Sequence, residues 1–193
     1  MRRSITAATR HHRVEHHRAV DVEQAPAAYK QIVGAPGDAP RCLQWVILSA
    51  CRSGEARLAT WAEIDLQAMT WTIPASRMKA RRAHRVPITP AMRALLPRRA
   101  GAADALVFPS NNGGAWSDMT LSMIVRRLGL DSTVHGWRAV FRMWGARAGH
   151  PRELLELALA HAVGGVEGAY HRDDLLERRR PIMASWAAFL IDD

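Results

Sequence analysis

Residues 70–88, TWTIPASRMKARRAHRVPI, contain two runs with the composition of β-strands on either side of a basic turn. The runs at 70–74 and 84–88 are short and rich in β-branched and apolar side chains, as strands usually are. The segment between them, 76–83, is strongly basic and is expected to face solvent. These features predict two strands joined by a hairpin-like connection.

Helical patterns surround this hairpin. Before it, residues 40–51 form a strongly apolar run that ends near Gly54, and residues 21–32 fit a helix entering the domain. After it, residues 105–109 could supply a third strand. Further helices are expected at 90–96, 117–128, 135–148, 151–161 and 173–190, with the last kinked or divided at Pro181. The sequence therefore predicts an α+β domain that is mostly helical, with one small three-stranded antiparallel sheet.

The charge of the chain indicates an acidic partner. Its 193 residues carry a net charge of +9 at pH 7, which favours nucleic acid first and an anionic membrane second. A solvated basic surface on an unrelated enzyme is the alternative. No apolar run has membrane-spanning length, and the N-terminus lacks the apolar stretch of a secretory signal. We expect a basic linker or arm at 1–20 and one cytoplasmic domain at 21–193, with no membrane partner.

Neither the cysteines nor the clustered histidines predict a metal centre. Cys42 and Cys51 are spaced for neither a metal knuckle nor a redox pair, and we expect buried thiols. The histidines at 11–12 and 16–17 have a spacing that could suit a metal, but only Glu15 accompanies them, so a basic linker is preferred. We predict no cofactor. The core or a partner surface is expected to contain Trp45, Trp61, Trp71, Trp137, Trp144 and Trp186.

Two cations near the N-terminal half are candidates for binding or chemistry. Arg52 comes at the end of the apolar helix, where a structural ion pair with Glu55 or Glu63 is the simpler explanation. Lys79 lies in the turn between the predicted strands, where a solvated role is the default. Lys30 and Lys79 are the only lysines, and the other fixed cations are arginines. Lys79 is therefore a candidate for chemistry that an arginine cannot perform.

The C-terminal half adds further candidates. His135 and Arg138 stand three residues apart at a helix start, so they share one face, and a helix N-terminus offers backbone donors to an anion. His161 is followed nine positions later by Tyr170, which lies in a glycine-containing run. The only other tyrosine, Tyr29, has no such neighbours. Each feature alone has an ordinary structural explanation, but together they form an ordered set.

That ordered set resembles the catalytic residues of the tyrosine recombinase (phage integrase) family. The matching residues are Arg52, Lys79, His135, Arg138, His161 and Tyr170. The surrounding segments are also similar, closest to prophage and genomic-island integrases: SACRSGEARLATWAEIDL (49–66), WTIPASRMKARRAHRVPIT (71–89), HGWRAVFRMW (135–144), LELALAH (155–161) and EGAYHRDDLLERRRPIMASWA (167–187). The likeness runs from about His16 to the C-terminus. Integrases of this kind usually carry N-terminal DNA-binding domains, so we expect this chain to begin near an interdomain linker.

The resemblance implies a metal-independent DNA strand transferase. Tyr170 would attack a phosphodiester and form a 3′-phosphotyrosyl link, which divides one transfer into two reversible steps. Two arginines can hold the phosphate through their planar forks, and Arg52 and Arg138 are the candidates.

The remaining residues would handle protons. Lys79 is the general-acid candidate for the leaving 5′ oxygen because lysine releases its proton more readily than arginine. His135 could accept the proton of Tyr170 or hold the phosphate, and the residues do not separate these roles. His161 could donate to a non-bridging oxygen.

The implied partner is double-stranded DNA at attachment sites. Five residues of the basic turn and second strand are expected to contact DNA: Arg77, Arg81, Arg82, His84 and Arg85. In recombinases of this kind the segment after the tyrosine often docks on a neighbouring protomer, which implies a homotetramer on DNA and a monomer when free. The expected outcome is integration or excision of a prophage or genomic island. The alternatives are a truncated module that binds DNA or an integrase partner without recombining, and a relaxing topoisomerase.

Overall fold

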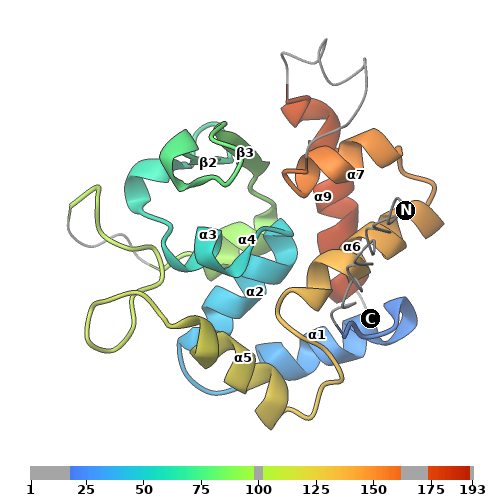
Figure 1. The fold of residues 1–193 in the computed structure, drawn as a ribbon, viewed down its shortest axis with the longest axis horizontal. Coiled ribbons are helices and arrows are strands. Elements are labelled where there is room, and N and C mark those ends of the chain that lie inside the picture. Colours follow the sequence, from blue (N-terminus) through green and yellow to red (C-terminus); the bar gives the residue numbers. More distant parts are fainter. Residues whose placement is uncertain (1–17, 98–101, 162–173, 192–193) are drawn as a thin grey trace, which may run out of the picture.

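The computed structural model describes residues 18–97, 102–161 and 174–191 (Figure 1). Its strands are β1 (Ile64–Asp65), β2 (Thr70–Ile73) and β3 (His84–Pro87). Short 3-10 turns lie at η1 (Val22–Gln24), η2 (Trp61–Glu63) and η3 (Ala75–Arg77). The helices are α1 (Ala25–Val33), α2 (Ala39–Ser49), α3 (Ser53–Arg57), α4 (Pro90–Leu95), α5 (Asp118–Arg127), α6 (Gly136–Arg147), α7 (Arg152–Ala158) and α9 (Leu176–Ile191). The predicted mostly helical α+β class is confirmed.

The three strands form one antiparallel sheet in the order β1-β2-β3. Trp71 in β2 pairs with Ile64 on one side and with Val86 on the other. Trp71 and Val86 are buried, whereas the neighbouring pair Thr72 and Arg85 is exposed. The sheet therefore packs one face on the core and exposes Thr72 and Arg85 on the other, where the neighbouring pair Thr70 and Pro87 is buried.

The position predicted for the third strand is wrong. Leu106 forms only an isolated bridge with Thr60, and Pro109 forms another with Ala115. A proline lacks the N–H group that would extend a ladder, which limits pairing at this point. The third strand is instead β1, which has two residues and is too short to leave a periodic signal in the sequence.

Helix α2 is the centre of the core and contacts α1, α3, α4, α5 and α9. Trp45 on this helix packs against Trp71 and Phe108, with ring centroids 5.6 and 5.5 Å apart. The six tryptophans predicted to be in the core are all buried. Cys42 and Cys51 are buried free thiols, as predicted, and burial raises the pKa of each to about 12.

Helix α9 packs along α1, α2 and β3 and passes Pro181 without a break. Of the kink or division predicted at that proline, the division does not occur, although Pro181 removes one backbone hydrogen bond from the helix interior. Trp186 donates its Nε1–H to the carbonyl of Ile47 at 3.0 Å, which ties α9 to α2. No helix within the three described ranges is both long and apolar enough to cross a membrane.

Candidate active site

The exit from α2 places Arg52. Ala50 has a left-handed φ of 53° and ends the helix, and Arg52 is extended before α3 begins. Glu55 reaches back from α3, accepting from the backbone N of Arg52 at 2.8 Å and from its Nη1 at 2.9 Å. The Glu55 side chain is 6% exposed and that of Arg52 is 33% exposed. A buried carboxylate thus holds one edge of this guanidinium and leaves the rest accessible to an anion.

Arg138 lies in the first turn of α6 with only 4% of its surface exposed. Its Nη1 donates to the carbonyl of Ala50 and its Nη2 to that of Leu159 at 2.6 Å. These carbonyls cap the C-terminal ends of α2 and α7, where the partial charge of a helix is negative and favours a cation. The buried Nε has no hydrogen-bond partner within the described residues. Burial lowers the pKa of Arg138, and the charge of Arg52 adds to this effect.

His161 follows α7 and contacts Arg138 directly. Its Nε2 lies 3.0 Å from Nη2 of Arg138, and its Nδ1 lies 2.7 Å from Oε2 of Glu156. The imidazole is 41% exposed, whereas the Glu156 side chain is 15% exposed. The ring therefore lies between a buried cation and a largely buried carboxylate.

One pocket of about 360 Å³ is lined by Arg52, His135 and Arg138. His135 is exposed and immediately precedes α6, so the pocket opens at the N-terminus of that helix. A helix N-terminus and two arginines make this a favourable place for an anion. His161 contacts Arg138, so four of the six predicted catalytic residues lie together: Arg52, His135, Arg138 and His161.

The other two predicted catalytic residues are not placed in this pocket. Lys79 is exposed in the turn between η3 and β3 and does not line it. Tyr170 lies outside the described residues, as do most of the predicted linker and the histidines at 11–12 and 16–17. The structure describes residues up to His161 and again from Asp174, which lie on either side of the segment that contains Tyr170.

Arg77 and Arg85, which were predicted to contact DNA, each form an ion pair with a described residue. Arg77 forms an ion pair with the buried Glu63 and donates to the carbonyl of Glu55. Its side chain is 20% exposed, so its contacts fix the start of the hairpin against α3 and do not fit a contact with DNA. Arg85 is 45% exposed and forms a double hydrogen bond with Asp174, which joins β3 to the chain before α9.

His84, which was also predicted to contact DNA, is buried with 6% exposure. Burial lowers its pKa to about 3, and the charge of Arg179 acts in the same direction. A neutral, buried imidazole does not fit a contact with the DNA backbone. Arg81 and Arg82 are exposed in the turn and remain candidates for that contact.

Sequence reasoning missed the carboxylates and arginines that support the site. Glu156 binds both His161 and Arg142, and Asp174 binds both Arg85 and the buried Arg179. Arg179 was hidden in a run of three arginines, where nothing in the sequence marks the one that is buried.

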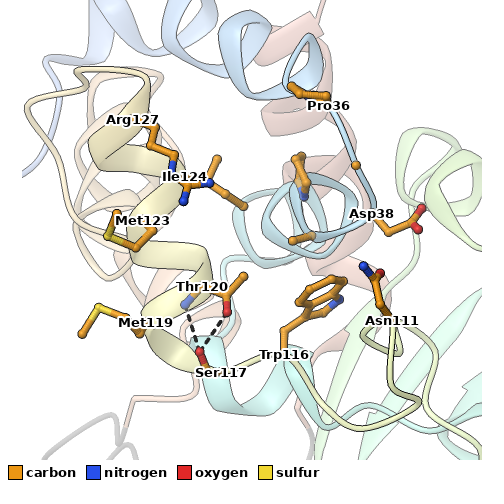
Figure 2. A pocket seen from close by; sticks show the side chains of 13 residues that line it. Pro36, Asp38, Asn111, Trp116, Ser117, Met119, Thr120, Met123, Ile124 and Arg127 are labelled. Atoms are coloured by element: carbon orange, nitrogen blue, oxygen red, sulfur yellow. Dashed lines mark hydrogen bonds between the residues drawn. The ribbon is translucent and has the colours of Figure 1, made fainter.

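A second pocket, of about 530 Å³, lies between the α1–α2 connection, the loop near Asn111 and helix α5. Figure 2 shows Trp116, Met119 and Met123 around it, and Ser117 accepting a hydrogen bond from the backbone of Thr120 at the start of α5. Its lining includes none of the five predicted catalytic residues that the structure describes. Among the described residues no group of three or more metal-ligating side chains could hold a metal ion.

Comparison with known proteins identifies the family. The phage integrase family matches residues 19–174. The chain belongs to the phage integrase family, the DNA breaking-rejoining tyrosine recombinases. Prophage integrase IntA of Escherichia coli (strain K12) is 37% identical over 155 residues, which cover 76% of this chain and 38% of IntA. The chain thus spans well under half of that relative.

Solved recombinases share the fold. The integrase from mycobacterium phage Brujita superposes with a TM-score of 0.65 at 15% identity, covering 83% of this chain and 56% of that integrase. A lambda integrase dimer bound to a COC′ core site superposes with a TM-score of 0.56 at 16% identity, covering 81% of this chain and 48% of that one. The arrangement of helices around the small sheet is therefore that of this family's catalytic domain.

Proposed function

We propose that this chain is the DNA-cleaving part of a site-specific recombinase that integrates or excises a prophage or genomic island in a bacterial cytoplasm. The observation that carries the proposal is the pocket lined by Arg52, His135 and Arg138, with His161 bound to Arg138. In a member of the phage integrase family, this is where a scissile phosphate of duplex DNA would bind.

Phosphodiester exchange needs an in-line nucleophile, donors to the non-bridging oxygens and a proton for the leaving group. The exposed edge of Arg52 supplies donors to the oxygens, and the buried positive charge of Arg138 behind it adds electrostatic attraction. The hydroxyl oxygen of Tyr170 forms a bond to phosphorus as the bond from phosphorus to the 5′ oxygen breaks. Lys79 gives a proton to that oxygen, and the proton of Tyr170 passes to His135 or to solvent. Attack by a new 5′ hydroxyl reverses the sequence and releases the tyrosine.

Lys79 must approach the phosphate for this reaction, and the hairpin supports such a movement. Its tip is exposed, whereas its base is held by Arg77 through Glu63 and the carbonyl of Glu55. Arg81 and Arg82 lie in the same exposed turn and can contact the DNA backbone as the turn closes. We expect assembly as a tetramer on DNA. Helix α9 buries Ile182, Trp186 and Leu190 in its own domain and leaves Ile191 47% exposed, so contacts between protomers through this helix would use its exposed residues.

The test is covalent trapping on a nicked suicide duplex that carries an attachment site. The wild-type chain should form a protein–DNA adduct, and Tyr170→Phe should abolish it. Tyr29→Phe is the matched control, because Tyr29 is buried in α1 at 3% exposure and should leave adduct formation unchanged. An adduct that persists in Tyr170→Phe would refute the assignment. Salt-dependent binding without any adduct would indicate a binding module instead.

A further inference from the structure

Four charged or polar side chains form a continuous chain of contacts beside the pocket. Arg142 on α6 donates from Nε to Oε1 of Glu156 at 2.6 Å. The other oxygen, Oε2, lies 2.7 Å from Nδ1 of His161, and Nε2 of His161 lies 3.0 Å from Nη2 of Arg138. Each oxygen of Glu156 thus serves a different partner, and each nitrogen of His161 does the same.

The chemistry of the two end groups determines where the imidazole proton lies. A guanidinium only donates hydrogen bonds, so Nε2 of His161 must accept from Arg138. A neutral imidazole carries one N–H, which then lies on Nδ1 and is donated to Glu156. An imidazole in the opposite tautomer would set Nε2–H against a guanidinium N–H and leave Nδ1 facing a carboxylate, with two unfavourable contacts.

The backbone fixes this geometry as well. Ala160 has a left-handed φ of 51°, which turns the chain back at the end of α7. The backbone N of His161 then donates to the carbonyl of Glu156 at 2.9 Å. Glu156 therefore holds His161 by its main chain and by its ring, although the two residues are five apart and would not share a face in a continuous helix.

We propose that Glu156 is a positioning residue, which keeps His161 in the Nδ1–H tautomer so that Nε2 can accept from Arg138 and orient it toward the phosphate. The proposal rests on the proposed function and adds a residue to its machinery. It also changes the role expected for His161, which in this arrangement accepts from Arg138 and does not donate to a phosphate oxygen. Glu156 acts through His161, and Arg142 acts through Glu156.

The decisive variant is Glu156→Gln, because an amide has only one accepting oxygen. Arg142 donates only and will take that oxygen, so the amide NH₂ faces Nδ1 of His161 and forces the opposite tautomer. Contact with Arg138 is then lost. Adding Arg142→Met frees the amide to rotate and present its oxygen to His161. The double variant should therefore recover the original tautomer, which a merely structural role for Glu156 does not predict.

Two measurements test this on the full chain. Nitrogen NMR of histidine-labelled protein, with His161 assigned by a His161→Gln variant, should show Nδ1 protonated in the wild type, Nε2 protonated in Glu156→Gln, and Nδ1 protonated again in the double variant. Single-turnover adduct formation should fall about 10- to 100-fold in Glu156→Gln, the range for loss of a partner that orients a metal-binding histidine. It should partly recover in the double variant, relative to Arg142→Met alone.

Glu23→Gln is the matched control, because Glu23 also pairs with an arginine of α6, Arg147, but both side chains are more than half exposed. It should change neither readout. An Nε2–H tautomer in the wild type, or no recovery in the double variant, would overturn the proposal. The NMR result does not depend on cleavage, so a chain that shows the expected tautomers but forms no adduct would refute the proposed function and leave the role of Glu156 in orienting His161 standing.

Discussion

Replacing Asp174 by asparagine should destabilise the chain because it removes the carboxylate beside a buried cation. Arg179 is 1% exposed, and its Nη2 lies 3.2 Å from Oδ2 of Asp174. Its Nε and Nη1 donate to the carbonyls of Asp174 and Arg85 at 2.8 Å, and these bonds survive the substitution. Breaking one side of a buried ion pair costs about 3–5 kcal/mol. Because the two carbonyl bonds remain, we expect a loss of about 3 kcal/mol in the free energy of unfolding.

Urea unfolding followed by circular dichroism measures this loss. Arg85→Gln is the control, because Arg85 is the other partner of Asp174. The side chain of Arg85 is 45% exposed, so its removal should cost about 1 kcal/mol or less. Asp174→Asn combined with Arg179→Met removes both buried charges and should recover part of the stability. A loss in Asp174→Asn no larger than that in Arg85→Gln would refute the view that Arg179 depends on this carboxylate.

Three further predictions concern packing, pH and catalysis. A Cβ at Gly145 would press on the side chain of Leu155, so Gly145→Ala should cost about 1–3 kcal/mol by thermal unfolding. Gly54→Ala should cost less, because a Cβ there would meet only the end of the Arg57 side chain, at 4.0 Å. The pKa of His84 falls from 6.5 to about 3 on folding, so the unfolded chain binds more protons between these values and stability is lost as pH falls through this window. His84→Leu should show a shallower dependence on pH there. Lys79→Arg should slow adduct formation about 10²–10⁴-fold, and a substrate with a 5′-bridging sulfur should recover the rate because a thiolate leaves without a proton.

Much of the fold could be predicted because apolar periodicity reports burial directly. The apolar run at 40–51 became α2, and its Trp45 lies at the centre of an aromatic cluster with Trp71 and Phe108. The strand at 64–65 could not be found in this way, because two residues carry no period and their pairing with β2 is set by tertiary structure.

The site residues were predicted less well than the fold, because the charge of a residue does not show whether its side chain is buried. Arg77 and His84 look like exposed cations in a basic turn, but Glu63 pairs with the first and the core encloses the second. Glu156 was missed because a spacing of five residues does not place two side chains on one helical face. Only the left-handed conformation of Ala160 brings Glu156 and His161 together, and alanine gives no sequence signal for that conformation.

The contacts at Asp174 also limit where the proposed nucleophile can act. Tyr170 precedes Asp174 by four residues, and a chain extends at most about 3.6 Å per residue, so their Cα atoms lie within about 14 Å of each other. His161, nine residues before Tyr170, allows a much looser limit of about 32 Å. Arg85 and Arg179 fix the position of Asp174 by binding it to β3, the strand that follows the Lys79 turn. The tighter limit is therefore measured from a point beside this strand. The proposed nucleophile and the proposed general acid are thus connected to one strand, and weakening the contacts of Asp174 should lower their effective concentration even where the domain stays folded.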